Sequence, residues 1–461
     1  MKHLYLIRHA KSSWADDSLR DHERPLNNRG QKQLGPMSKA VLAEGALDGP
    51  VFCSNAIRAR QTLEGLIPRD LRKAAYIAPV LYTFNHEILI DWLRGREDES
   101  ITLIGHNPAL EELAGYLLKH PPESFPTCSF MHIALPIKRW HKLSRNKGRL
   151  EQFLTPKDVS YEQFDRKRTK VRTDDEPPLA RHIPEALLRQ YQRMRDLEPG
   201  VLRGYDDEFL HQYRIAIRRS RAIAEAIVEI SGDSDLRKAV KVLKGHAQAT
   251  SHLRDLHVFL GDLAQWLLEE KTQAALVSSG ARSHFANLTN VEHQTLAKRL
   301  NSRKYQRDMD DWHQLITSRH LAKITRKLAT GDIRKALNTR MDRYNSQVRQ
   351  LNDQSPDENF HALRKQLKRI RYLAELDKPT FRDMLRPLKH RQQRFGDFQD
   401  LHVQIEMLLA FRDSIATEPD MLEPVAGLND LISSLAEEKT RVREDLLALG
   451  GIEEHLFNES Q

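Results

Sequence analysis

The chain has few cysteines and no long apolar run. Its 461 residues include only Cys53 and Cys128, both in apolar surroundings, which excludes a disulfide framework and a cysteine zinc site. No apolar stretch approaches the roughly 20 residues that span a bilayer. The first residues also lack the basic segment, apolar stretch and cleavage site of a secretory signal in that order. We therefore expect a cytoplasmic protein with two buried, reduced thiols and no membrane partner.

The charge excess is small and is spread along the chain. Lys and Arg number 73 against 64 Asp and Glu, which gives a formal net charge of +9 at pH 7. Net charge bears on steering and solubility rather than on a particular ligand. Any anion-binding site must therefore come from local grouping of basic residues.

The pattern of apolar residues changes near residue 155. Before it, the short apolar runs HLYLIR, PVFCS, SITLIG and MHIAL alternate with helical patterns, which predicts an α/β domain over residues 1–155. Residues 156–183 are charged and contain Pro177-Pro178, which predicts an exposed linker. Residues 184–461 carry almost purely helical patterns. The sequence thus predicts two domains, the second of them all-α.

The helical region contains an internal repeat. HQYRIAIRRSR at 211–221 matches HALRKQLKRIR at 361–371, and HLRDLHVFL at 252–260 matches DFQDLHVQI at 397–405. Two blocks in the same order and at nearly the same separation indicate a duplicated helical unit.

Basic side chains follow three of the predicted strands. Arg8 and His9 close the first strand, Arg58 begins the helix after the VFCS run, and His106 follows ITLIG. Because open α/β sheets bind ligands beyond the carboxyl ends of their strands, we expect these side chains to converge. Guanidinium groups match phosphate oxygens, and a neutral imidazole can attack phosphorus. The combination predicts a phosphoryl-transfer site, whereas a single Arg-His pair after a strand is usually structural.

Four motifs in this region resemble the histidine phosphatase superfamily, in particular its small SixA-like phosphohistidine phosphatases. They are RHAKSSW at 8–14, RPLNNRG at 24–30, SNAIRARQT at 54–62 and GHNPALEELA at 105–114. The resemblance covers residues 1 to about 150 and implies a three-layer, phosphoglycerate-mutase-like α/β domain that needs no metal or other cofactor. It implies that His9 is the nucleophile and becomes phosphohistidine. The other residues expected in the site are Arg8, Arg58 and His106 for catalysis and Arg24, Asn107 and Tyr82 for substrate binding. Pro25 and Gly30 are expected to be turn residues.

The acid that many larger relatives use to protonate an alcohol leaving group has no obvious counterpart. Near its position the sequence reads PVLYTFNHEILIDWL, where Tyr82 is the nearest aligned residue and His86 or Glu87 are substitutes. Imidazole, with a pKa of about 6.5, leaves more readily than an alkoxide. The absence favours P–N or other activated phosphoryl bonds, and we predict phosphohistidine on a partner protein as substrate.

Each copy of the repeat carries a basic stripe. At about 100° per residue, the basic side chains of one helix fall within about 80° of one another. Like charges at this spacing repel by roughly 0.2–0.5 kcal/mol per pair, so their occurrence in duplicate indicates a bound polyanion rather than a merely solvated face. The stripes are His211, Arg214, Arg218 and Arg221, and His361, Arg364, Lys368 and Arg371.

Together with the RDLHV and QDLHV blocks, these helices resemble the CHAD domain, the conserved histidine α-helical domain, across residues 184–455. The resemblance implies a helical bundle with an internal pseudo-twofold repeat whose basic helices bind inorganic polyphosphate. Arg219 and Arg369 join the stripes by this resemblance, and Lys244 and Lys389, with Lys241 and Arg386, extend them from neighbouring helices. Asp255 and Asp400 are expected to orient arginines.

Nucleic acid is the rival polyanion, but the stripes offer no aromatic for base stacking beyond Tyr372, so polyphosphate is preferred. No Glu-x-Glu-x-Lys motif of triphosphate-handling barrels occurs, which assigns any hydrolysis to the first domain. Three hypotheses stay open: an active phosphohistidine phosphatase, a weak or inactive polyphosphate-binding scaffold, and a phosphatase of another small phosphoryl substrate including polyphosphate. The predicted location is cytoplasmic, with association with polyphosphate granules.

Overall fold

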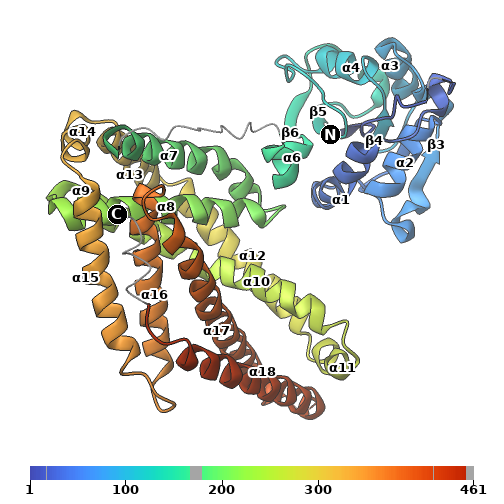
Figure 1. Ribbon diagram of the computed structural model, residues 1–461. Helices are drawn as coiled ribbons and strands as arrows, with labels where there is room; N and C mark the ends of the chain where they lie inside the picture. The colour runs from blue at the N-terminus through green and yellow to red at the C-terminus, as the bar shows by residue number, and fades with distance from the viewer. Residues whose placement is uncertain (17, 167–178, 419, 453–461) are drawn as a thin grey trace. The chain divides into compact units, whose positions relative to one another are not determined.

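A computed structural model describes residues 1–16, 18–166, 179–418 and 420–452 (Figure 1). The chain divides into two compact units, unit 1 with residues 1–170 and 203–209 and unit 2 with residues 171–202 and 210–461. The predicted linker contains two short helices, α5 (Pro156–Val159) and α6 (Tyr161–Asp165), and its residues 167–178 lie outside the described residues. Within the described ranges, no helix has both the length and the apolarity of a membrane span.

Unit 1 contains a six-stranded mixed sheet. Its strand order is β3 (Ala75–Ile77), β2 (Val51–Cys53), β4 (Ser100–Gly105), β1 (Lys2–Arg8), β5 (Phe130–Leu135) and β6 (Arg149–Leu154). The first four strands run parallel, and β5 is antiparallel to both β1 and β6. Arg8 pairs with Gly105 across β1 and β4, so the residues that follow these strands start from adjacent carboxyl ends.

Alternating side chains of β1 belong to two separate cores. Leu4 and Leu6 pack in the core of α3 (His86–Arg94) and α4 (Ala109–Leu117), whereas Tyr5 and Ile7 pack in the core of α1 (Asn28–Ala43) and α2 (Ile57–Leu66). Figure 1 shows these helix pairs on opposite sides of the sheet. The three-layer α/β fold is confirmed. Cys53 and Cys128 are buried free thiols, also as expected.

Gly30 lies in the first turn of α1, so the expectation that it is a turn residue was wrong. Its backbone N–H donates to the side chain of Asn27, the N-cap of α1, at 2.9 Å. A Cβ at Gly30 would lie 2.3 Å from the carbonyl oxygen of Lys11. Glycine is therefore required by the close approach of α1 to the segment after β1.

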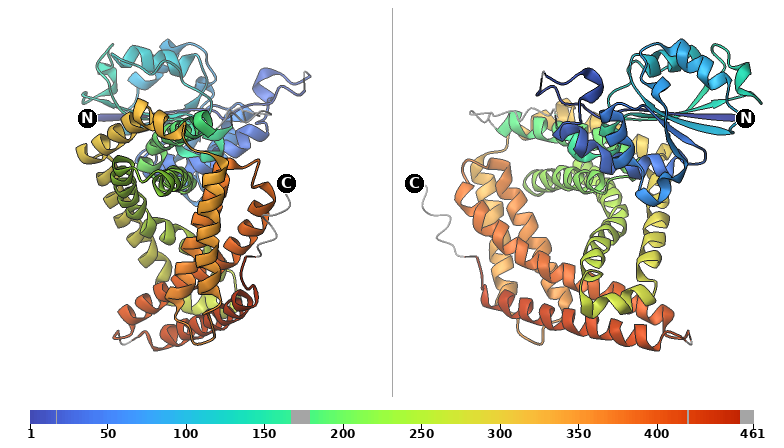
Figure 2. Two further views of the ribbon diagram at one scale, coloured as in Figure 1. Left: turned by 60° about the vertical axis from the view of Figure 1, so that its left-hand side comes forward. Right: turned by 90° about the vertical axis from the view of Figure 1, so that its right-hand side faces the viewer.

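Unit 2 is helical, which confirms the predicted all-α fold. Its helices are α7 (Leu179–Arg203), α8 (Glu208–Ser231), α9 (Ser234–Ala249), α10 (Ser251–Trp266), α11 (Glu270–Ser278), α12 (Ala281–Leu300), α13 (Arg303–Ile316), α14 (Arg319–Thr325), α15 (Thr330–Val348), α16 (Asp357–Ala374), α17 (Arg382–Ile415) and α18 (Leu422–Ala448). Figure 2 shows the long helices α17 and α18, drawn in orange to red, which pack against each other. Leucine and phenylalanine side chains of α10, α12, α17 and α18 form one shared core.

The sequence repeat pairs α8 with α16, and α9 and α10 with α17. In the first copy, α9 and α10 are separated at Thr250, whereas the second copy has one helix of 34 residues. The two basic stripes therefore lie on α8 and α16.

Candidate functional sites

His9 follows β1 and is only 8% exposed. Its Nδ1 lies 2.7 Å from the carbonyl oxygen of Ala10, and its Nε2 lies 3.3 Å from Nε of Arg58. Donation from Nδ1–H to the carbonyl assigns the tautomer in which Nε2 carries the lone pair. Burial, together with the charges of Arg58 and Arg8, lowers the pKa of His9 to about 3. The imidazole is therefore neutral at pH 7 and its Nε2 can act as a nucleophile.

Arg58, in the first turn of α2, connects His9 to His106. Its Nε donates to His9, and its Nη2 lies 3.3 Å from Nδ1 of His106. The Nε2 atom of His106 lies 2.8 Å from Oγ of Ser54. Burial, followed by the proximity of His9 and Arg58, lowers the pKa of His106 to about 2. Side chains from the ends of three strands thus meet in one cluster.

Arg8 and Asn107 share one backbone acceptor beside this cluster. Nη1 of Arg8 donates to the carbonyl oxygen of Phe125 at 2.7 Å, and Nδ2 of Asn107 donates to the same oxygen at 3.1 Å. Within the described residues, Nε of Arg8 and Oδ1 of Asn107 are buried without a hydrogen-bond partner. Burial lowers the pKa of Arg8. Both residues therefore have polar atoms left for a ligand.

Asp21, which was not predicted from the sequence, binds the cations of this site. Its Oδ2 accepts hydrogen bonds from Nη2 of Arg58 at 2.7 Å and from the hydroxyl of Tyr82 at 2.9 Å, and its Oδ1 lies 3.1 Å from Nη2 of Arg24. Burial favours the neutral acid, but the hydrogen bonds from Arg58 and Tyr82 prevail and hold the pKa of Asp21 below its usual value. The ionised carboxylate of Asp21 thus neutralises positive charge of Arg58 and Arg24 that would otherwise be available to a phosphoryl group.

Arg24 and Tyr82 both bind Asp21, and Tyr82 also contacts His106 directly. Arg24 is buried, and its guanidinium carbon lies 3.4 Å from the ring centroid of Trp14. The ring of Tyr82 meets that of His106 edge-on at 5.3 Å. Of the substitutes proposed for the missing acid, His86 has its Nδ1 3.0 Å from Glu112, and Glu87 is exposed on α3.

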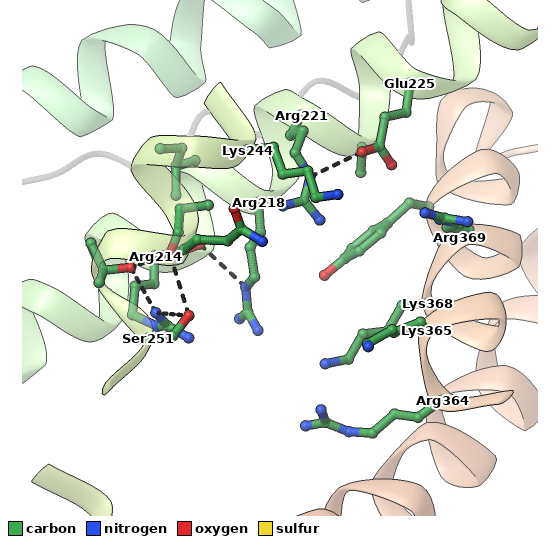
Figure 3. Close-up of a pocket in the computed structure, with 16 residues that line it drawn as sticks. Arg214, Arg218, Arg221, Glu225, Lys244, Ser251, Arg364, Lys365, Lys368 and Arg369 are labelled. Carbon is green, nitrogen blue, oxygen red and sulfur yellow. Dashed lines mark hydrogen bonds and ion pairs between the residues drawn. The ribbon is translucent and has the colours of Figure 1, made fainter. Parts of the chain in front are cut away.

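In unit 2, a cavity of about 390 Å³ lies between α8 and α16. We call it the basic cavity. Figure 3 shows arginine and lysine side chains of α8 and α16 pointing toward one another across it. Lys365, Tyr372, Thr250 and Ser251, which were not predicted as ligands, also line it. Its predicted basic lining residues are Arg214, Arg218 and Arg221 on α8, Lys244 on α9, and Arg364, Lys368 and Arg369 on α16.

Positive charge in the basic cavity is poorly compensated. Among its lining residues, all of them described, the one carboxylate is Glu225, which lies 3.1 Å from Arg221. Nη1 of Arg214 donates to Oγ1 of Thr250 at 2.6 Å, a neutral partner. Burial, and then the charges of neighbouring arginines, lowers the pKa of Lys368 to about 7. Neighbouring positive charges destabilise one another's protonated states, and a polyanion bound between them relieves this repulsion.

The other predicted polyphosphate ligands do not line the basic cavity. Arg219 lines a separate cavity beside Glu375, and Nε of Arg371 lies 3.3 Å from that same carboxylate. The ring of His361 packs at 4.8 Å from that of His402. The predicted ligands outside the basic cavity are His211, Arg219, His361, Arg371 and Lys389.

Asp255 and Asp400 line a further cavity, which shares Arg214, Arg218, Arg364 and Lys368 with the basic cavity. Burial raises the pKa of both carboxyls. In the part of the chain that the structure describes, neither carboxylate forms an ion pair with an arginine, so the predicted orienting contacts are not made. The carboxylates act on Arg214 and Arg364 only through longer-range charge interactions.

Two family models match separate parts of the chain. The histidine phosphatase superfamily (branch 1) matches residues 4–74, and the CHAD domain matches residues 185–409. The chain therefore belongs to the histidine phosphatase superfamily in its N-terminal part and carries a CHAD domain in its C-terminal part. Both resemblances drawn from the sequence motifs are confirmed.

Relatives and solved structures cover one part of the chain or the other. An uncharacterized chloroplastic protein of Arabidopsis thaliana is 30% identical over 128 residues, which are 25% of this chain and 59% of that protein. An uncharacterized protein of Mycobacterium tuberculosis is 34% identical over 110 residues, 23% of this chain and 67% of that protein. The chain thus spans about three fifths of the plant relative.

The solved structure of the protein histidine phosphatase SixA complexed with tungstate is 20% identical, with a TM-score of 0.29, over 34% of this chain and 99% of that one. The CHAD domain from the plant Ricinus communis is 19% identical, with a TM-score of 0.48, over 61% of this chain and 96% of that one.

Proposed function

We propose that the protein removes the phosphoryl group from phosphohistidine on a partner protein, through a covalent intermediate on His9, and that unit 2 binds inorganic polyphosphate. The observation that carries the first part is the buried, neutral His9, whose Nδ1 is held by the Ala10 carbonyl while its Nε2 faces Arg58. A cytoplasmic location in association with polyphosphate granules belongs to the same proposal.

The reaction proceeds in two displacements at phosphorus. Nε2 of His9 attacks as the P–N bond of the substrate breaks, and the departing imidazole takes up a proton from solvent. Water then attacks the phosphorylated His9, loses a proton to solvent, and inorganic phosphate leaves as the His9–P bond breaks. Arg8 and Arg58 stabilise the charge on the phosphoryl oxygens in both steps.

The protonation state of Asp21 supports a P–N substrate. Arg58 and Tyr82 keep this carboxyl ionised, and burial raises the pKa of Tyr82, so neither group is a good proton donor at neutral pH. An alkoxide leaving group needs such a donor, whereas an imidazole does not. Phosphohistidine is therefore favoured over ordinary phosphate esters.

Hydrolysis of a phosphohistidine domain and of a phosphoserine peptide tests this proposal. We expect the phosphohistidine to be cleaved at least about 10²-fold faster, the usual contribution of a general acid. His9→Ala should abolish turnover and trapping of a phosphorylated enzyme, and His120→Ala, at an exposed position, is the matched control. Equal or faster cleavage of the ester would refute the substrate, and turnover by His9→Ala would refute the nucleophile.

The polyphosphate part rests on the cations of the basic cavity, of which only Arg221 has an ion-pair partner among the described residues. Polyphosphate carries one negative charge for nearly every unit, which suits the facing rows of guanidinium and ammonium groups. It has no bases that need a stacking surface, and Tyr372 is the single aromatic residue in the lining of the basic cavity. Nucleic acid would need further stacking surfaces.

Competition binding tests this part. Polyphosphate should bind with a steep salt dependence and displace single- and double-stranded DNA at equal phosphate concentration. Arg218→Ala should weaken binding about tenfold or more, as expected for loss of a charged hydrogen bond. Arg219→Ala, the neighbouring position outside the basic cavity, is the matched control. Preference for DNA, or equal effects of the two substitutions, would overturn the assignment.

A further inference from the structure

A second cavity, of about 360 Å³, adjoins the basic cavity on the side of α15. Glu225 on α8 and Arg369 on α16 line both cavities. Arg237 on α9 and Arg340 and Arg343 on α15 also line the second one. We call it the α15 cavity. Basic residues therefore continue from the basic cavity into the α15 cavity through Arg369.

Arg340 has a structural role in the α15 cavity. Its Nη2 forms an ion pair with Glu229, and its Nη1 donates to the carbonyl oxygen of Arg369 at 2.6 Å. These contacts fasten α15 to α8 and α16. Arg340 is thus neutralised and held, and it is not the residue to alter in a binding test.

Arg237, Arg343 and Arg369 are the cations left for a ligand. All three are exposed, and none of their guanidinium groups has a hydrogen-bond or ion-pair partner among the described residues. The two carboxylates of the α15 cavity are already compensated, Glu225 by Arg221 and Glu229 by Arg340. The free charge of this cavity is therefore positive, as it is in the basic cavity.

We propose that the α15 cavity is a second polyphosphate subsite. A chain that fills the basic cavity continues past Arg369 and meets Arg237 and Arg343. This inference rests on the proposed polyphosphate binding of unit 2 and adds a dependence on chain length. Tripolyphosphate engages the basic cavity alone, whereas a long chain engages both cavities and releases more counterions, which steepens its salt dependence.

The test compares tripolyphosphate with long-chain polyphosphate on the full-length protein. The double variant R237A/R343A should bind the long chain about tenfold or more weakly and lower its salt slope by about 2, one for each lost phosphate contact. Its affinity for tripolyphosphate should be unchanged. R349A/R441A, which removes two exposed arginines outside both cavities, is the matched control, and R237K/R343K should restore most of the long-chain affinity.

An unchanged affinity of R237A/R343A for the long chain would overturn the subsite, and so would an equal loss for both ligands. If the proposed polyphosphate binding of unit 2 is wrong, the experiment gives a different result. If R218A/R364A, in the basic cavity, still binds tripolyphosphate and long chains as the wild type does, then polyphosphate binding by unit 2 is itself refuted.

Discussion

At the scale of single residues, Lys368 is where burial and charge conflict most clearly. Its ammonium group is partly buried beside Arg364 and Arg218, and burial, followed by these charges, lowers its pKa from 10.5 to about 7. A phosphate group would supply the missing negative charge and raise this pKa. Binding of a polyanion must therefore take up a proton whenever Lys368 is neutral in the free protein.

We expect the affinity for polyphosphate to fall as the pH rises above about 7. The fall is up to about tenfold per pH unit as long as the pH stays below the pKa that Lys368 has in the complex. Below pH 7 this contribution is constant, because Lys368 is already protonated in the free protein. Lys368→Arg should remove this part of the pH dependence, since a guanidinium stays protonated. Calorimetric titration in buffers of different ionisation enthalpy measures the proton uptake. An affinity of the wild type that is flat between pH 7 and 9 would contradict the expectation.

Some residues of the His9 cluster could be predicted from the sequence, and others could not. The two histidines and two arginines of the cluster lie at strand ends or in a first helical turn, where apolar periodicity fixes their position. Asp21 was missed because it begins a 3-10 helix of only three residues, Asp21–Glu23, between β1 and α1, and so short a helix has no apolar periodicity in the sequence. The signal that could have found it is its place three residues before Arg24.

At the scale of elements, the contact of α1 with the segment after β1 depends on Gly30. Any Cβ there would meet the Lys11 carbonyl at 2.3 Å, a backbone atom that moves only with the segment that follows His9. Gly30→Ala should therefore lower the free energy of unfolding by about 1–3 kcal/mol, the usual cost of overpacking, and reduce phosphatase activity.

Gly115→Ala, on α4 of the same unit, provides the control. A Cβ at Gly115 meets nothing within 4 Å, so alanine should stabilise α4 by up to about 1 kcal/mol through its higher helix propensity. Urea unfolding of the two variants checks both values. Equal changes at the two positions would show that the close approach does not determine the effect.

The repeat in unit 2 shows what the residue pattern of a single helix can and cannot predict about the cavity that its side chains line. The stripes on α8 and α16 could be predicted, but a helical wheel gives directions about one axis and not toward a neighbouring helix. Arg219, about 100° from Arg218, consequently lines another cavity. Lys244 and Lys389 occupy equivalent positions in the two copies of the repeat, yet of the two only Lys244 lines the basic cavity. The two copies also differ in their helices, because the first is interrupted at Thr250, between α9 and α10, whereas α17 is continuous.

At the scale of the whole molecule, each unit has its own cores and its own candidate site. The His9 cluster draws its residues from unit 1, and the basic cavity draws its residues from unit 2. A ligand that binds a folded unit raises the stability of that unit by mass action, by about 2.7 kcal/mol at one hundred times its Kd. The two ligands should therefore act on different unfolding transitions.

Differential scanning calorimetry of the full chain measures this. We expect polyphosphate to raise one transition and inorganic phosphate at high concentration to raise the other, and Gly30→Ala identifies the transition of unit 1 by lowering it. R218A/R364A should abolish the shift by polyphosphate without altering the shift by phosphate. If polyphosphate instead raised the transition that Gly30→Ala lowers, and did so in R218A/R364A as well, the polymer would be binding at the His9 cluster. That outcome would favour polyphosphate as a substrate of His9 over its role as a ligand of the helical unit.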